Sequence, residues 1–204
     1  MKKSGKATEL KAFLRSAARE VESQQGSYLI VGVGGGSCSG KSTVATELIN
    51  HLEDGAVLLM DDYYRSQAVS DERFDVNFDE PGSLDLDLLC SHLETIRGGG
   101  TVRKPLYDFE THCRKGFEMF IPSRVTILDG LFALHDNIRP HLDFGIFCDC
   151  SDRERMRRRV ARDSEERGRS RVSIVHQYAT TVRPMHERYV EKTRVGANWV
   201  ILNE

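Results

Sequence analysis

The sequence lacks a long apolar run, a paired cysteine motif and a strong excess of charge. No apolar stretch approaches the ~18 residues that a membrane-spanning helix needs, and no apolar signal core follows the basic start "MKKSGK". The five cysteines are odd in number and include no Cys-x-x-Cys pair, which argues against a disulfide framework. We therefore expect a reduced, cytoplasmic protein with no membrane partner.

The net charge of −2 also gives no global reason to expect binding to nucleic acid. What the chain does have is enough length and apolar content for one well-formed core, with 204 residues of which 39% are hydrophobic. There are no internal repeats or low-complexity tracts. These features indicate a single globular domain.

Short apolar segments alternate with helical patterns along the chain. Residues 8–22 carry apolar side chains at helical spacing and predict an amphipathic helix, and helical patterns recur at 42–52 and 86–96. Residues 97–122 interrupt the alternation and predict an excursion from the sheet. Five segments lack the strict alternation of half-exposed strands, which predicts a parallel sheet with helices on both faces: 28–33, 56–60, 125–128, 144–148 and 199–202.

A glycine-rich motif follows the first of these strands. Gly35 to Ser42, within "GVGGGSCSGKST", match the pattern G-x-x-x-x-G-K-S between a predicted strand and a predicted helix. Glycines let backbone N–H groups converge on phosphate oxygens, Lys41 adds positive charge, and the Ser42 hydroxyl can bind Mg²⁺. An ordinary glycine-rich turn is the alternative, and the flanking strand and helix favour a nucleotide phosphate site.

Acidic residues follow two other strands. Asp61 and Asp62 come after residues 56–60, and Asp129 comes after residues 125–128. Sites in parallel α/β sheets form at the carboxyl ends of the strands, so these acids should lie beside the phosphate loop. The "DG" at 129–130 could be a plain β-turn, but beside a phosphate loop Asp129 is predicted to hold Mg²⁺ directly or through water.

At this point the chain resembles the uridine-cytidine kinases, in the family shared with phosphoribulokinases. The resemblance runs from Tyr28 to about Ile201 and rests on "GGSCSGKST", "DDYY", "NFDEPGSLD", "YDFETHCR" and "RDSEERGRS". It implies a P-loop kinase-like α/β fold with a five-stranded parallel sheet, a β-hairpin at about 100–122 and an arginine-rich lid at about 162–172. It also divides the chain into an N-terminal helical extension, 1–26, and a kinase domain, 27–204.

The resemblance implies roles for individual residues. Asp61 would be the base that faces the acceptor hydroxyl, with Lys41 and Arg169 also catalytic. ATP would bind through Gly35, Gly36, Ser37, Ser39, Gly40, Lys41, Ser42 and Thr43, together with Arg162 and Arg167. The acceptor would bind through Tyr64, Phe78, Asp79, Tyr107, His112, Arg114, Arg159, Arg169 and Gln177. Mg²⁺ would bind at Ser42 and Asp129.

The implied reaction is ATP-dependent phosphorylation of uridine or cytidine at the 5′-hydroxyl. An ionised Asp79 suits the ribose diol, and Tyr107 and His112 suit a pyrimidine ring. Alternative interpretations are a kinase of the same family that acts on another riboside, ribulose phosphate or pantothenate, and a regulatory nucleotide-binding protein with reduced catalysis. The expected partners are ATP and a nucleoside, with no nucleic acid and a possible homo-oligomer.

The arginine run has alternatives of its own. Residues 153–171 contain nine arginines and four acids. The run could be one solvated basic face of a helix, with Met156 and Val160 on the opposite face, or a surface that binds RNA or DNA. No nucleic-acid module accompanies it, and a lid that clamps phosphates explains it without a second partner.

The family usually carries a small residue where this chain has Asp62. Adjacent side chains that leave a strand point to opposite faces, so Asp61 and Asp62 cannot both reach one hydroxyl. We expect Asp62 to point away, and either to cap the next segment or to approach Mg²⁺ through water. By the same reasoning Tyr63 is predicted to pack internally and Tyr64 to line the acceptor pocket.

Overall fold

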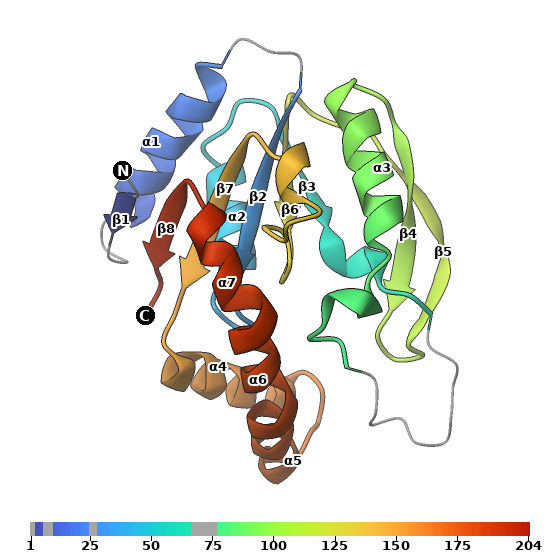
Figure 1. Ribbon diagram of the computed structural model, residues 1–204, viewed down its shortest axis with the longest axis vertical. Coiled ribbons are helices and arrows are strands. Elements are labelled where there is room, and N and C mark those ends of the chain that lie inside the picture. Colours follow the sequence, from blue (N-terminus) through green and yellow to red (C-terminus); the bar gives the residue numbers. More distant parts are fainter. Residues whose placement is uncertain (1–2, 6–9, 25–27, 67–76) are drawn as a thin grey trace.

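The protein is built on a parallel β-sheet. The computed structural model describes residues 3–5, 10–24, 28–66 and 77–204. Six parallel strands have the order β1-β8-β7-β2-β6-β3 (Figure 1). The strands are β1 (Lys3–Gly5), β2 (Leu29–Gly35), β3 (Gly55–Leu59), β6 (Val125–Asp129), β7 (Phe144–Asp149) and β8 (Trp199–Leu202). The predicted five-stranded parallel sheet is confirmed, and the short edge strand β1 extends it by one strand that the sequence did not reveal.

Alternate residues of the central strands enter two separate cores. In β2, Leu29, Val31 and Val33 belong to one core and Ile30 to the other. The side-chain period of 2 along a strand produces this division. Both faces of the sheet are therefore apolar, which explains why the strand sequences showed no polar alternation.

One core lies under α1 (Leu10–Glu22) and α2 (Lys41–Ile49). The buried residues of α1 include Leu14, Ala17, Ala18 and Val21 at helical spacing. Trp199 of the same core stacks on Phe144 with ring centroids 5.1 Å apart. The predicted N-terminal helix thus packs on the sheet through its apolar face. Its predicted start at residues 8–9 lies outside the described residues.

The other core lies under α3 (Leu86–Arg97) and the β-hairpin. Strands β4 (Val102–Asp108) and β5 (Cys113–Phe120) form a separate antiparallel pair, which confirms the predicted excursion. The α3 residues Leu89, Leu93 and Ile96 are buried in this core. The hairpin packs beside α3 at the far side of the sheet from β1 (Figure 1).

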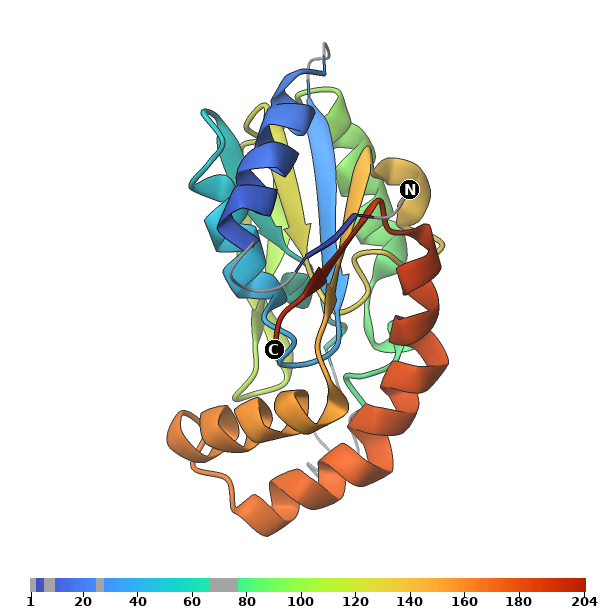
Figure 2. The ribbon, with the colours of Figure 1, turned by 90° about the vertical axis from the view of Figure 1, so that its left-hand side faces the viewer.

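Two helical segments close the carboxyl end of the sheet. Helix α4 (Asp152–Glu165) is capped by Ser151 and leads through a turn into α5 (Arg171–Gln177). A nearly continuous helix then runs through α6 (Arg183–Met185) and α7 (Glu191–Thr193), with wider π turns at Tyr178–Val182 and His186–Val190. Figure 2 shows α4 and α5 beyond the carboxyl ends of the strands, at the opposite end of the sheet from the C-terminal end of α1.

The buried face of α4 contains charged side chains. Arg155, Arg159 and Asp163 are its buried residues, whereas Met156 and Val160 are only half-buried. The alternative of one solvated basic face opposite Met156 and Val160 is therefore wrong for this helix. The arginines turn inward because buried carboxylates and carbonyl groups accept their hydrogen bonds.

Two further observations concern the cysteines and the helices. All five cysteines are free thiols. Within the described ranges, no helix combines the length and apolar character needed to cross a bilayer.

Candidate active site

The phosphate loop lies between β2 and α2, as its sequence predicts. Gly40 has φ +86°, in the left-handed region that glycine adopts without strain, and α2 begins at the next residue, Lys41. Lys41 is half-buried and lines the pocket described below. The loop therefore presents backbone N–H groups, a helix N-terminus and a lysine at one place, as phosphate binding requires.

The strand ends place Asp129 beside the phosphate loop. In the sheet Asp129 is level with Val33 of β2 and Leu59 of β3. Its side chain is buried, and its Oδ1 atom has no hydrogen-bond partner in the described part of the chain. Such an oxygen fits an Mg²⁺ ion held by few protein ligands and by substrate phosphates. The Ser42 hydroxyl, in the first turn of α2, is exposed and could supply a second ligand.

Asp61 and Asp62 point to different places, but not from a strand. Residues Met60–Tyr63 form a 3₁₀ turn directly after β3. Asp61 lines the pocket, whereas Asp62 contacts Lys104 of β4 at 2.6 Å. Asp62 thus points away from the pocket that Asp61 lines, as predicted for the second acid. Its role differs from the two that we expected. Asp62 forms an ion pair with the hairpin, whereas we expected it to cap the next segment or to approach Mg²⁺ through water.

The surroundings of Asp61 disfavour its charge. Desolvation raises the pKa of Asp61 most; the Lys41 ammonium opposes this rise, and the charges of Asp129 and Asp62 add to it. The carboxylate remains open to solvent through the pocket, although protein surrounds its other sides. A carboxylate with a raised pKa and a nearby lysine is suited to accept a proton from an alcohol.

Aromatic side chains form the wall next to Asp61. Tyr64 is buried, and its hydroxyl donates to the Phe78 carbonyl at 3.1 Å. The Phe78 ring lies 5.3 Å from the His112 ring at an interplanar angle of 33°. His112 has φ +55°, and its Nδ1 atom is buried without a described partner. A strained backbone that holds an unsatisfied ring nitrogen at a pocket is typical of a binding site.

Asp79 also belongs to this wall, and it lies in the described segment that begins at residue 77. It is 9% exposed and lines the pocket. Burial raises the pKa of Asp79, and the positive charges of Arg159, Lys41 and Arg162 oppose the rise. The carboxylate therefore lies within the field of the cationic groups across the pocket.

Two predicted acceptor residues lie behind the wall. The Tyr107 ring packs 5.5 Å from Tyr64, and burial raises the pKa of Tyr107 to about 12. Arg114 donates to the backbone carbonyls of Tyr63 and Tyr64 and pairs with Asp85 at 3.1 Å. Neither residue lines the pocket in this structure. Both hold the hairpin against the segment that carries Asp61.

A cluster of arginines forms the opposite side of the pocket. Arg159 donates to the Ser37 hydroxyl at 2.9 Å, which joins α4 to the phosphate loop. Gln177 accepts from both Arg159 and Arg169, at 3.2 and 2.7 Å. Four arginines surround the carboxylate of Asp163 within 4 Å: Arg159, Arg162, Arg167 and Arg169.

Asp163 was missed as a site residue from the sequence. It appeared there only as one of the acids that reduce the charge of the arginine run. Its side chain is 0% exposed, and its Oδ2 atom has ion-pair contacts but no well-aligned hydrogen bond. The spacing of four between Arg159 and Asp163 on a helix is the signal that could have found it.

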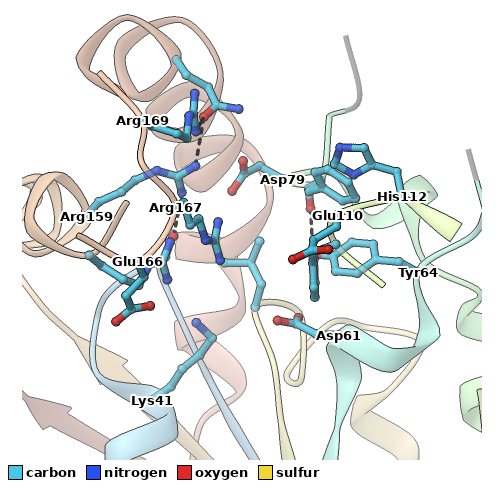
Figure 3. Close-up of a pocket in the computed structure, with 16 residues that line it drawn as sticks. Lys41, Asp61, Tyr64, Asp79, Glu110, His112, Arg159, Glu166, Arg167 and Arg169 are labelled. Atoms are coloured by element: carbon cyan, nitrogen blue, oxygen red, sulfur yellow. Dashed lines mark hydrogen bonds between the residues drawn. The ribbon is translucent and has the colours of Figure 1, made fainter. Parts of the chain in front are cut away.

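The pocket has a cavity volume of about 710 Å³. Figure 3 shows sixteen residues that line it, with labelled cationic groups (Lys41, Arg159, Arg167, Arg169) on the left. On the right lie the carboxylates of Asp61 and Asp79, near Tyr64 and His112. Among the described lining residues, all but four had been predicted; the four missed ones are Phe109, Glu110, Leu131 and Glu166.

The predicted residues divide by position. Those that line the pocket are Ser37, Lys41, Asp61, Tyr64, Phe78, Asp79, His112, Arg159, Arg162, Arg167, Arg169 and Gln177. Gly35, Gly36, Ser39, Gly40, Ser42, Thr43 and Asp129 belong to the phosphate loop, to α2 and to the end of β6. Phe109 and Glu110 stand inside the quoted motif "YDFETHCR", but their directions at a hairpin turn cannot be read from it.

Comparisons with known proteins agree with this geometry. Residues 30–203 match the phosphoribulokinase / uridine kinase family. Uridine kinases from Staphylococcus aureus, of strains JH9 and Newman, are 40% identical over 178 residues, which is 84% of this chain and 86% of theirs.

Solved structures share the fold at lower identity. A candidate fructose transport system kinase from Silicibacter sp. TM1040 has a TM-score of 0.80 at 19% identity, covering 94% of this chain and 98% of that one. A candidate uridine kinase from Bacillus stearothermophilus has a TM-score of 0.72 at 18% identity, covering 95% and 98%. The family match and the 40% identity together show that the chain belongs to the phosphoribulokinase / uridine kinase family.

Proposed function

We propose that the protein is an ATP- and Mg²⁺-dependent kinase that phosphorylates the 5′-hydroxyl of uridine or cytidine. The observation that carries this proposal is the division of charge across the pocket. Lys41 and the arginines line one side, whereas carboxylates and aromatic rings line the other. A polyphosphate donor suits the first side, and an uncharged acceptor with hydroxyl groups and a flat ring suits the second.

The transfer would proceed with Asp61 as the proton acceptor. The 5′-oxygen of the nucleoside attacks the γ-phosphorus, the bond between this phosphorus and the β–γ bridging oxygen breaks, and ADP leaves. The hydroxyl proton passes to a carboxylate oxygen of Asp61. Lys41 and Arg169 would stabilise the negative charge on the phosphoryl group, while Arg162 and Arg167 hold the donor.

Residues of the acceptor wall would position the nucleoside. Asp79 would accept hydrogen bonds from the ribose hydroxyls. Phe78 and His112 would hold the pyrimidine, with Tyr64 beside them and Tyr107 and Arg114 as support. Arg159 and Gln177 would connect this wall to the lid, residues 162–172. We infer that Mg²⁺ is held by Ser42 and Asp129, where it would neutralise phosphate charge.

The same division of charge weighs against other acceptors. Ribulose phosphate and pantothenate carry negative charge, and they would meet the carboxylates of Asp61, Asp79 and Glu110 on the acceptor wall. The repulsion between these negative charges would weaken the binding of such an acceptor. Another riboside remains the alternative acceptor in the same class.

A regulatory role and nucleic-acid binding have less support. The groups needed for transfer, Lys41 and Asp61, both face the pocket. Arg162 and Arg169 pair with Asp163 and also line the pocket, so they are not arrayed as an open basic surface. We propose a cytoplasmic enzyme that binds neither nucleic acid nor membranes.

We propose the same domain division that the sequence suggested. Residues 1–26 would form an extension and residues 27–204 the kinase domain, with the boundary itself outside the described residues. The packing of α1 on the sheet supports a role for the extension in covering the core. The exposed side chains of Phe117, Met119 and Ile121 near the outer hairpin strand favour a homo-oligomer.

The test is to measure ADP formation and the phosphorylated product with MgATP and a panel of acceptors. The panel contains uridine, cytidine, other ribosides, ribulose 5-phosphate and pantothenate. We expect 5′-monophosphates of the pyrimidine nucleosides, and no product from the Lys41→Ala variant. Product from ribulose 5-phosphate or pantothenate alone would refute the nucleoside assignment, and ATP binding without any product would favour the regulatory alternative.

A further inference from the structure

Glu110 places a third carboxylate on the acceptor wall. It lies in the turn between β4 and β5, where its backbone N–H donates to Oδ1 of Asp108 at 2.9 Å. Its side chain lines the pocket, and Figure 3 shows it on the same side as Asp61, Asp79 and Tyr64. The proposed reaction uses the carboxylates of Asp61 and Asp79 and gives no role to Glu110.

The carboxylate of Glu110 is not paired with a cation in the described part of the chain. Within the described ranges, no lysine, arginine or histidine nitrogen forms an ion pair with it. The cationic lining residues Lys41, Arg159, Arg167 and Arg169 lie on the other side of the pocket (Figure 3). Glu110 is exposed to solvent at the mouth of the pocket, so its carboxylate is free to accept hydrogen bonds from a ligand that enters there.

The residues around Glu110 suit a planar ring. Phe109, its neighbour in the turn, lies 5.8 Å from the ring of Tyr64 and 6.0 Å from that of Phe78. His112, two residues further on, packs against Phe78. A base held among these rings would have its polar edge near the turn, where the Glu110 carboxylate projects.

The two pyrimidines differ at the group that a carboxylate can recognise. Cytosine carries an exocyclic amino group at C4, which donates hydrogen bonds, whereas uracil carries a carbonyl oxygen there, which only accepts. Carboxylate side chains recognise cytosine through this amino group. The carbonyl oxygen of uracil would instead face the lone pairs of the carboxylate.

We propose that Glu110 is a specificity-determining residue that favours cytidine over uridine by accepting a hydrogen bond from the 4-amino group. This inference rests on the proposed nucleoside kinase activity and adds the choice of base to it. Glutamine at this position can present either a donor or an acceptor, so Glu110→Gln removes the preference without changing the size of the side chain.

The experiment compares kcat/KM for cytidine with kcat/KM for uridine at saturating MgATP. We expect the wild-type protein to favour cytidine, and Glu110→Gln to lower the cytidine-to-uridine ratio by about 5- to 100-fold. A general disturbance of the hairpin would reduce both values together and leave their ratio unchanged. The ratio therefore separates base recognition from a merely structural role.

Glu166→Gln is the matched control, since Glu166 lines the same pocket on the arginine side. We expect this variant to keep the wild-type ratio, whatever its effect on turnover. An unchanged ratio in an active Glu110→Gln variant, or a wild-type preference for uridine, overturns the inference and leaves the proposed function intact. Failure of the wild-type protein to phosphorylate either nucleoside overturns the proposed function itself.

Discussion

The ammonium group of Lys104 lies 2.6 Å from Oδ2 of Asp62 and joins the β-hairpin to the turn that carries Asp61. Lys104 is 7% exposed, and its second partner is Glu118 at 2.9 Å. The pair gives the second acid of "DDYY" a structural role. Since the hairpin also carries His112 and Glu110, this contact fixes one wall of the pocket relative to the proposed base.

Lys104→Met should destabilise the protein strongly, because it leaves two carboxylates without their common partner. Removing one member of a buried ion pair typically costs about 3–5 kcal/mol, and the half-exposed Glu118 reduces the expected loss to about 2–3 kcal/mol. Asp62→Asn should cost less, since Lys104 keeps Glu118. Urea unfolding of both variants, with Glu118→Gln as control, measures these differences.

The same Asp62→Asn variant tests the proposed separation of the two acids. We expect it to retain most of its kcat, with no recovery of activity when Mg²⁺ is raised. Steady-state kinetics across a Mg²⁺ series provide the measurement. A large loss of kcat that extra Mg²⁺ restores would place Asp62 at the metal and contradict its assignment to the hairpin.

Asp61→Asn should lower kcat by about 10²- to 10⁴-fold, because it removes the proton acceptor and keeps the shape of the side chain. ATP affinity should remain nearly unchanged. The folded protein raises the pKa of Asp61, so its ionised form costs stability above the unfolded pKa, and Asp61→Asn should preserve or increase the melting temperature.

The pH profile gives a second measurement on Asp61. The wild-type kcat/KM should fall as the pH decreases through the raised pKa, at a higher pH than for an ordinary aspartate. The Asp62→Asn variant should retain this acidic limb, because Asp61 stays in place. A near-normal kcat for Asp61→Asn would mean that another group accepts the proton.

Asp163→Asn should loosen the arginine cluster, because four guanidinium groups lose their shared counter-charge. We expect a loss of about 3–5 kcal/mol in unfolding free energy. Bound phosphates can replace the missing charge, so MgATP should raise the melting temperature of this variant more than that of the wild type. Thermal unfolding with and without MgATP measures both effects.

Asp152→Asn is the matched control on the same helix. Asp152 pairs with Arg155 and Arg183, and it does not line the pocket. Its variant should lose stability without any added response to MgATP. An equal response in both variants would show that Asp163 supports the helix alone and not the phosphate side of the pocket.

His186 should make the protein less stable in mild acid. Burial and the charge of Arg155 lower the pKa of His186 to about 4, and the charge of Asp152 offsets this only in part. The unfolded chain therefore binds a proton more readily between about pH 6.5 and pH 4, and stability is lost as the pH falls through this window. Each pH unit costs at most about 1.4 kcal/mol for one group.

His186→Gln should flatten this dependence, measured as unfolding free energy from pH 7.5 to pH 4.5. His176→Gln, at an exposed position of α5, should leave the slope as it is in the wild type. Equal slopes in the wild type and in His186→Gln would mean that folding does not lower the pKa of His186.

The sequence alone was enough to predict most of the fold and the phosphate site, because both depend on local sequence patterns. Short apolar runs without alternation are typical of strands covered on both faces, and the left-handed φ of Gly40 in the phosphate loop is one that glycine adopts without strain. The family motifs then identified most of the residues that line the pocket. These features depend on neighbours in the chain, which a sequence displays directly.

Only the tertiary structure determined which partners the charged side chains contact and which of these side chains line the pocket. Asp62 and Lys104 are 42 residues apart in the sequence, so no local sequence pattern predicts their contact. Asp163 is buried because arginines on both sides of a turn converge on it, and Glu110 enters the pocket because of the direction in which a hairpin turns. Long-range electrostatics and side-chain direction follow from packing, which composition and spacing do not specify.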